Sequence, residues 1–540
     1  MTSRATRFGG LLITGLLALA SPAHAAFDEP VETDSGLVSG APGAVEGVQA
    51  FKGIPFGAPP VGELRWQPPH PVEPWDGVRP GDAFGPVCMQ PRGEGRVNVS
   101  VDLPDSPPQS EDCLTLNVWT PAESADERLP VMVWIFGGAY YEGAGSSPHN
   151  HGDHLAAKGV VLVTFNYRLG PLGFLAHPEL TAESEHNASG NYALADSIAT
   201  LQWVQRNIAA FGGDPDNVTI FGESAGAAMA GGLVGSPEAA GLFHRAIAES
   251  GAWMGLTIAP MRSRESAEAQ TVEAAAELGL DTLAELRAMP AEEASSMLPR
   301  QGMIIDGWIV PEDLSITFAE GRQNAVDVLV GSNRDEGAFA NFGPPMTADA
   351  WAESAQQRWG ELADAGLAAY PVANDAEAAA ASTSLMGDNM AWHMRLFAER
   401  QATLGKNAWL YYFTHEPPYP EGARNMGAVH TVEIPYVFNN LAPPRVFPDA
   451  SSPELASADP RELAFADEVS SYWVNFARTG DPNGPGLPEW PAFTALGPNE
   501  AMVLDADGSG RGPSISEAKL DLYGDLYARQ VAAGNEPAGQ

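Results

Sequence analysis

Positively charged residues are scarce in this 540-residue chain. Lysine and arginine together number 29, against 69 aspartate and glutamate, which gives a formal net charge of −40 at pH 7. Because such a surface repels phosphate groups, the composition excludes nucleic acid and anionic membranes as expected partners. We interpret most of the negative charge as a solvated shell that keeps the protein soluble; the alternative is a role in steering substrates.

Cysteine is almost absent, with Cys88 and Cys113 as the two cysteines of the sequence. No C-x-x-C spacing occurs, which argues against a metal site built on thiolates. In an oxidising compartment an isolated pair most simply forms one disulfide, and a loop of this size would stabilise the fold by about 3–4 kcal/mol through chain entropy. Two buried free thiols are the alternative.

Long hydrophobic runs are also missing, apart from one near the N-terminus. Arg4 and Arg7 precede "LLITGLLALA" (11–20), and small residues follow at Ala23 and Ala25. This run is too short to span a bilayer, and no later segment has about 20 uninterrupted apolar residues. We predict that residues 1–25 are a cleaved secretory signal and that 26–540 form one secreted or periplasmic domain; an uncleaved anchor is the alternative.

Buried β-like runs alternate with helix-like stretches through the first half of the chain. The β-like runs are "LPVMVWIFG" (129–137), "GVVLVTFNYRLG" (159–170), "NVTIFG" (217–222) and "VDVLVGSN" (326–333), and the clearest amphipathic helix is 193–211. This alternation predicts an α/β fold with a mostly parallel sheet and helices on both faces. An alanine-rich segment, 345–410, is expected to be helical and to form a cap or rim.

One serine stands between two glycines where a strand-like run meets a helix-like one, in "NVTIFGESAGAAMAGGL" (217–233). A sharp strand-to-helix turn at this point would present the hydroxyl of Ser224 as a nucleophile. The start of the helix would aim the amide of Ala225 at a developing oxyanion. The glycine-rich stretch 133–145 predicts two further oxyanion donors, the amides of Gly138 and Ala139. Plain turns required for packing are the alternative at both places.

Several long stretches, in the same order, resemble the type-B carboxylesterase/cholinesterase family. They are "FKGIPFGAPPVGELRWQPP" (51–69), "SEDCLTLNVW" (110–119), "FGGDPDNVTIFGESAG" (211–226) and "SSYWVNFARTGDPN" (470–483). The resemblance runs from about residue 30 to the C-terminus. It implies the α/β-hydrolase fold and hydrolysis of carboxylic esters without a cofactor or a metal.

The resemblance also selects partners for Ser224. In this fold the acid and then the histidine follow the serine along the chain. His430, in "MGAVHTVEIPYVF" (426–438), matches the catalytic histidine of the family, and Glu336, after the last β-like run, matches its acid. The neighbouring Asp335 is the less favoured choice. Glu336 would orient His430 and stabilise the imidazolium that forms when the proton of Ser224 is taken.

Further residues match supporting positions of the family. The resemblance implies that Glu223 tunes the site and that Ser250 holds Glu223 in place. It also implies two ion pairs that serve the scaffold, Arg65 with Glu111 beside the cysteine loop, and Arg168 with Asp196.

A histidine-rich segment offers a competing metal chemistry. His149, His151, Asp153 and His154 lie close together in "SPHNHGDHLAAKG" (147–159), and zinc sites use such residues. We interpret the segment as a polar loop that enters a helix, because the expected esterase needs no metal.

The substrate is less closely defined by the sequence. The cysteine-closed loop, 89–112, has no aromatic residue for cation–π binding of a quaternary ammonium, which argues against acetylcholine. It contains Arg92 and Arg96, which would bind an acyl group with free carboxylates if they faced the site; solvent-exposed loop charges are the alternative. The chain also resembles secreted bacterial esterases that remove tricarballylate from fumonisin mycotoxins. A catalytically silent adhesion or binding protein and a lipase are the competing functions.

Overall fold

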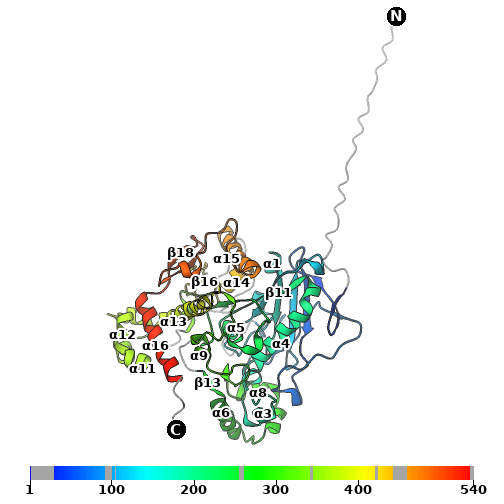
Figure 1. Ribbon diagram of the computed structural model, residues 1–540, viewed down its shortest axis with the longest axis horizontal. Helices are drawn as coiled ribbons and strands as arrows, with labels where there is room; N and C mark the ends of the chain where they lie inside the picture. Colours follow the sequence, from blue (N-terminus) through cyan, green and yellow to red (C-terminus); the bar gives the residue numbers. More distant parts are fainter. Residues whose placement is uncertain are drawn as a thin grey trace.

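A central sheet with helices packed around it forms the body of the protein (Figure 1). The computed structural model describes Met1 and residues 30–91, 100–103, 105–254, 261–340, 345–419, 422, 424–441 and 459–534. The four β-like runs of the sequence analysis are all strands of this sheet, and every residue of the strand that begins at Val161 is buried. The predicted α/β class with a mostly parallel sheet is confirmed.

Eleven strands of the described residues make up the sheet. In spatial order they are β18 (Gly510–Pro513), β17 (Glu500–Leu504), β16 (Ala408–Phe413), β15 (Asp327–Asn333), β12 (Arg245–Glu249), β11 (Gly213–Glu223), β9 (Leu129–Ile135), β10 (Val161–Phe165), β8 (Thr115–Thr120), β4 (Gln49–Pro55) and β3 (Ala41–Pro42). The strands from β17 to β10 run parallel, and the remaining pairs at both edges are antiparallel.

The register of the central strands determines which residues meet at one edge of the sheet. Glu223 of β11 lies opposite Glu249 of β12, and Glu249 lies opposite Gly331 of β15. On the other side, Gly222 lies opposite Ile135, the last residue of β9. Because these strands are parallel, the loops that follow them all leave the sheet at the same edge.

Two helices of the central region follow the predicted pattern. Helix α4 (Tyr192–Asn207) has an apolar stripe that is buried, and a short 3₁₀ turn continues it to Phe211. Helix α5 (Ala225–Gly235) is buried at every residue, which explains its composition of alanine, glycine and a few aliphatic side chains. Small residues let this helix pack closely against the sheet.

The alanine-rich segment is helical, as predicted. It contains α10 (Ala348–Glu353), α11 (Ala355–Trp359), α12 (Ala363–Ala369) and the long α13 (Asp375–Thr403). Trp351, Trp359 and Tyr370 form a small hydrophobic cluster of their own with Leu522 of α16 (Glu517–Gly534). In Figure 1, α11, α12 and α16 lie together at one side of the molecule, so this part of the segment is a rim.

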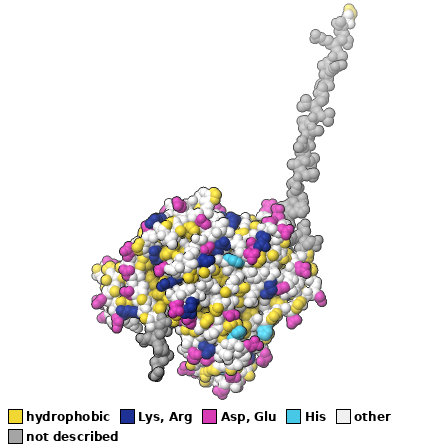
Figure 2. Space-filling model, viewed as in Figure 1, with side chains coloured by type: hydrophobic (Ala, Val, Ile, Leu, Met, Phe, Trp, Pro, Cys, Tyr) yellow, Lys and Arg dark blue, Asp and Glu magenta, His cyan; other side chains and the backbone are white. Residues whose placement is uncertain are grey.

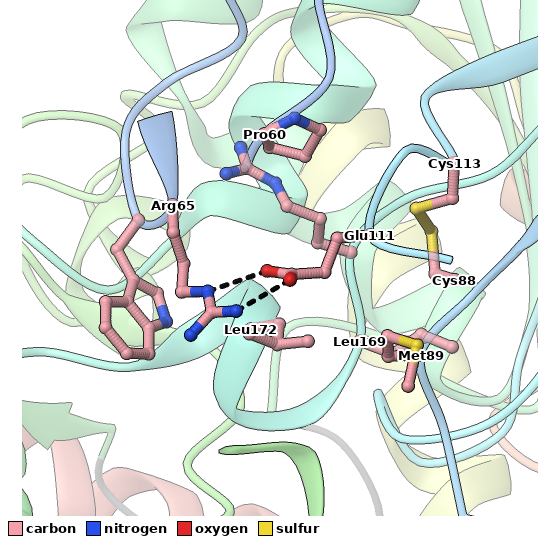
Figure 3. A pocket seen from close by; sticks show the side chains of 10 residues that line it. Pro60, Arg65, Cys88, Met89, Glu111, Cys113, Leu169 and Leu172 are labelled. Atoms are coloured by element: carbon pink, nitrogen blue, oxygen red, sulfur yellow. Dashed lines mark hydrogen bonds and ion pairs between the residues drawn. A yellow bond between two sulfur atoms is a disulfide. The ribbon is translucent and has the colours of Figure 1, made fainter. Parts of the chain in front are cut away.

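Cys88 and Cys113 form a disulfide, which confirms the predicted pairing. Figure 3 shows the bond beside the ion pair of Arg65 and Glu111, whose guanidinium and carboxylate make two parallel hydrogen bonds of 2.7 and 2.6 Å. The cavity between these groups has a volume of about 10 Å³, room for no more than about one water molecule, so this is a structural brace and not a ligand site.

The second predicted ion pair is also present. The guanidinium of Arg168 donates three hydrogen bonds to the carboxylate of Asp196, its backbone amide donates a fourth, and both side chains are buried. Arg168 additionally donates to the carbonyl oxygen of Gln67 at 2.8 Å. Removal of one partner would leave an uncompensated buried charge, so this pair serves the fold.

The surface carries the negative charge in a dispersed form. Figure 2 shows acidic side chains spread over the visible face, with basic side chains among them, and no continuous patch of one sign. This distribution agrees with a solvated shell.

Candidate active site

Ser224 stands at a strained turn between β11 and α5. Its backbone angles are φ 55° and ψ −120°, a conformation that residues with a Cβ rarely adopt. The amide of Ser224 donates to the carbonyl oxygen of Glu249 at 2.9 Å, and the carbonyl of Ser224 accepts from Ala228 at 2.9 Å. These hydrogen bonds hold the turn so that the hydroxyl leaves the sheet edge.

The two flanking glycines are required by close packing. A Cβ at Gly222 would lie 2.6 Å from the carbonyl oxygen of Ile135, and a Cβ at Gly226 would overlap the same oxygen. The backbone of β9 therefore passes directly against the elbow. The Gly-x-Ser-x-Gly pattern is explained by this approach of strand, turn and helix.

The structure brings together the three residues predicted as serine, base and acid. The Nε2 atom of His430 lies 2.8 Å from the Ser224 Oγ, and its Nδ1 lies 2.5 Å from Oε2 of Glu336. The other oxygen of Glu336 accepts the amide of Asn333 at 2.7 Å, and the carboxylate is fully buried. The less favoured Asp335 faces elsewhere, toward the Arg334 guanidinium and the amide of Ala428.

The loop after β9 has the backbone geometry of a donor site. Gly138, Ala139 and Tyr140 have consecutive positive φ angles of 107°, 54° and 64°. A Cβ at Gly137 would lie 3.1 Å from the Cβ of Ser224, so the loop passes directly beside the serine. Among the described residues no protein group accepts a hydrogen bond from the amides of Gly138, Ala139 or Ala225, which leaves all three able to donate to a substrate oxygen.

Glu223 contributes a second carboxylate to the same histidine. Its Oε1 lies 3.2 Å from Nε2 of His430, and the side chain is 2% exposed. The predicted contact of Ser250 with Glu223 is wrong. The Ser250 hydroxyl donates to Oε1 of Glu433 at 3.5 Å, whereas the carboxylate of Glu223 faces His430.

Two buried acids that interact with the carboxylate of Glu223 were missed by the sequence analysis. Glu433 lies one turn beyond His430 and accepts from Nδ2 of Asn333 at 2.5 Å. Glu249 ends β12 and accepts from the indole of Trp473 at 2.7 Å. The sequence carried a signal for Glu249, a glutamate at the end of an apolar strand, and a weaker one for Glu433, which stands among apolar residues.

Burial and mutual repulsion raise the pKa values of these acids. Burial is the largest cause for Glu223, Glu249 and Glu433; the neighbouring carboxylates add to it, and the pKa of Glu433 reaches about 7. Burial lowers the pKa of His430, but the charges of Glu223 and Glu336 outweigh it and raise that pKa to about 10. The cluster therefore holds protons that isolated side chains would release.

We expect Glu249→Gln to reduce the dependence of stability on pH. Because the pKa of Glu249 is raised in the folded protein, the folded state binds more protons than the unfolded chain above the usual pKa, and the free energy of unfolding falls as pH rises. Glutamine keeps an acceptor for the indole of Trp473. Because it does not ionise, it removes this fall in the free energy of unfolding. Urea unfolding between pH 5 and 8 should show a flatter profile for the variant, which is more stable than wild type at pH 8.

Glu249→Ala is the matched control for that measurement. It leaves the buried indole N–H of Trp473 without its acceptor, so it should be less stable than Glu249→Gln at every pH. Parallel pH profiles for wild type and Glu249→Gln would show that Glu249 is ionised in the folded protein, contrary to this assignment.

Several predicted residues lie outside the described residues. Arg92 and Arg96 belong to this group, as does the predicted signal segment beyond Met1. No helix within the described part of the chain is long and apolar enough to cross a membrane.

The histidine-rich segment is distributed over separate contacts. His151 Nε2 lies 3.2 Å from the carbonyl oxygen of Ser146, and the carboxylate of Asp153 accepts the amide of Ala44. No group of three metal-ligating side chains is found among the described residues. The segment enters the short helix α1 (Asp153–Ala156), as expected of a loop that leads into a helix.

Comparisons with known proteins agree with this geometry. The model of the carboxylesterase family matches residues 28–520. The chain is 41% identical over 520 residues to the fumonisin B1 esterase of Sphingopyxis macrogoltabida, covering 93% of this chain and 92% of the relative. It is 35% identical over 513 residues to the para-nitrobenzyl esterase of Bacillus subtilis, covering 91% and 98%.

Solved structures give the same result for the fold. The crystal structure of a carboxylesterase from Geobacillus stearothermophilus matches with a TM-score of 0.75 and 34% identity, and covers 92% of this chain and 99% of that chain. The predicted α/β-hydrolase fold is thereby confirmed. With a family match over most of its length and such relatives, the chain belongs to the carboxylesterase family and is a carboxylic ester hydrolase.

Proposed function

We propose that the protein is an exported serine esterase in which Ser224 is the nucleophile, His430 the general base and Glu336 the residue that orients the base. One observation carries this proposal: a continuous series of hydrogen bonds joins the carboxylate, the imidazole and the hydroxyl at a strained turn. The Ser224 hydroxyl ends this series beside the backbone amides of Gly138, Ala139 and Ala225, which have no protein acceptor among the described residues. This is the arrangement that acyl transfer requires.

The reaction proceeds in two halves. The Ser224 oxygen attacks the ester carbonyl carbon as His430 accepts the hydroxyl proton, and the amides of Gly138, Ala139 and Ala225 bind the oxyanion. The tetrahedral intermediate collapses, the bond to the alcohol oxygen breaks, and His430 returns the proton to the leaving alcohol. Water then attacks the acyl-enzyme with the same proton transfers and releases the carboxylic acid.

The protonation of His430 sets the working pH range. Only the neutral imidazole accepts a proton, and the nearby carboxylates raise the pKa of His430 to about 10 when they are ionised. A proton on Glu223 or Glu433 removes part of this effect, because a neutral carboxyl no longer stabilises the imidazolium. His430, Glu223 and Glu433 therefore share their protons, and the imidazole becomes fully available as a base when the last of these protons is lost. We expect kcat/KM to rise with pH through that range.

For the substrate we propose esters whose acyl group carries further carboxylates, including the tricarballylate esters of fumonisin-type mycotoxins. The support is the similarity to the fumonisin B1 esterase over nine-tenths of both chains. The predicted signal at residues 1–25 supports action outside the cytoplasm.

A substrate screen and covalent labelling test the proposed function together. The screen compares p-nitrophenyl esters with neutral acyl groups against fumonisin B1, with release of tricarballylate as the readout. An organophosphate should abolish turnover and add its phosphoryl mass to the peptide that contains Ser224. Folded protein without turnover and without this adduct would favour a silent binding protein, and a rate increase restricted to emulsified long-chain esters would favour a lipase.

A further inference from the structure

The segment 299–303 lies against the loop that is proposed to bind the oxyanion. A Cβ at Gly302 would lie 3.1 Å from the ring of Tyr140, and Met303 approaches α5, with its sulfur 2.8 Å from the position of a Cβ at Gly232. The segment therefore contacts both elements that build the site, the loop after β9 and the helix that begins beyond Ser224.

Gln301 fixes the position of this segment. Its side-chain oxygen accepts the amide of Ala176 at 3.0 Å, and its side-chain nitrogen donates to the carbonyl oxygen of Ala267 at 2.7 Å. These two hydrogen bonds fix the backbone of the segment beside Gln301. The side chain of the neighbouring Arg300 is exposed.

Arg300 is positioned by Tyr141. Its guanidinium lies 3.3 Å from the centre of the Tyr141 ring and also donates a hydrogen bond to the Tyr141 hydroxyl. Among the described residues no carboxylate lies within 4.0 Å of this guanidinium. Its positive charge is therefore uncompensated there, in a chain with 69 acidic residues.

Tyr141 connects this charge to the proposed oxyanion donors. It stands two residues beyond Ala139, and its amide donates to the carbonyl oxygen of Gly138 at 2.9 Å, so the two share one turn. Ala139 is exposed and Ser224 is partly exposed, which shows that the site opens at this place. Tyr141 belongs to the turn that borders this opening, so the Arg300 guanidinium that it contacts is held beside the place where an ester would reach Ser224.

We propose that Arg300, held by Tyr141, determines specificity by binding a free carboxylate on the acyl group of the substrate. The planar guanidinium donates two parallel hydrogen bonds to a carboxylate, and its stacking on the tyrosine ring reduces the entropy lost on binding. A protein of net charge −40 repels an anionic ester, and a local cation without an acidic neighbour offsets this repulsion where the ester binds. The inference rests on the proposed esterase function and assigns the residue that selects the substrate class.

Two esters that differ mainly by one terminal charge test the inference. They are p-nitrophenyl valerate and the mono-p-nitrophenyl ester of glutaric acid, which has the same five-carbon acyl chain ending in a carboxylate. We expect Arg300→Gln to lower kcat/KM for the glutarate ester about tenfold, chiefly through KM, the effect of one charge-assisted contact. The valerate ester should change by less than about twofold, and Arg300→Lys should retain part of the preference.

Arg79→Gln is the matched control. Arg79 is likewise exposed and lies over an aromatic ring, 5.3 Å from that of Trp75. It belongs to a separate three-stranded sheet, formed by β1 (Val31–Thr33), β2 (Gly36–Ser39) and β5 (Val78–Pro80). The substitution removes the same charge from a different sheet and from a different aromatic partner, so it should leave the ratio of the two kcat/KM values unchanged.

The outcomes separate this inference from the proposed function. An unchanged ratio in Arg300→Gln, or an equal loss in Arg79→Gln, overturns the role of Arg300 while leaving the esterase intact. Wild-type protein that hydrolyses neither ester and forms no organophosphate adduct overturns the proposed function itself. Salt should weaken the glutarate preference of wild type and have little effect on Arg300→Gln.

Discussion

Ser224→Ala should lower kcat for ester hydrolysis by about 10⁴- to 10⁶-fold, since the variant lacks the hydroxyl that forms the acyl-enzyme in the proposed mechanism. The backbone strain at φ 55° is already present in the wild type, and alanine has the same Cβ. The fold should therefore be retained, with circular dichroism and Tm close to those of the wild type. Initial rates on a chromogenic short-chain ester, measured with purified protein, check the loss.

Ser250→Ala is a matched control for this variant. Ser250 is also a serine at a positive φ, 53°, and directly follows a strand of the same sheet, but its hydroxyl contacts Glu433 and not His430. We expect it to retain most of the activity. Turnover by Ser224→Ala above about one hundredth of the wild-type rate on the same ester would contradict the assignment of the nucleophile.

Glu336→Gln should lower kcat by roughly 10³- to 10⁴-fold, the effect of removing the buried carboxylate from such a series. Glutamine cannot stabilise the imidazolium by charge, and its amide nitrogen can hold the wrong tautomer of His430. Glu336 also accepts a hydrogen bond from the amide of Asn333, and the side-chain oxygen of glutamine can accept the same bond. The variant should therefore fold. The pH profile of kcat/KM should shift to lower pH, since a carboxylate that raises the pKa of His430 is lost.

Asp335→Asn discriminates between the two adjacent acids. Asp335 pairs with Arg334 at a partly exposed position and accepts the amide of Ala428, a bond that asparagine can still accept. We expect a loss of less than about tenfold. A loss in Asp335→Asn as severe as in Glu336→Gln would show that the adjacent acid, and not Glu336 alone, is required.

Much of this site could be predicted from sequence, because its chemistry lies at the ends of buried strands. Apolar runs give the strands, and Gly222 and Gly226 mark the place where the backbones of β9, β11 and α5 meet. The partners of Ser224 lie 112 and 206 residues further along the chain, so pattern alone could not select them. The resemblance to a family supplied that long-range information.

The surroundings of the histidine could not be predicted in the same way. Whether Ser250 contacts Glu223 or Glu433 depends on the register of β11 and β12 and on the position of a segment 183 residues away, and local spacing encodes neither. Arg300 was not identified for a similar reason. Its importance comes from its contact with Tyr141, 159 residues away in sequence, and from the absence of an acidic neighbour among the described residues.

The buried acids Glu249 and Glu433 have a consequence for a working esterase. Each ester cleaved near neutral pH liberates one carboxylic acid, so the medium becomes more acidic as product accumulates. Glu249 and Glu433 bind protons more tightly in the folded state than in the unfolded chain, and mild acidification therefore favours the folded state. These two groups therefore offset part of the stability that acid removes through carboxylates whose pKa is lowered in the folded state, such as Glu416 and Glu462.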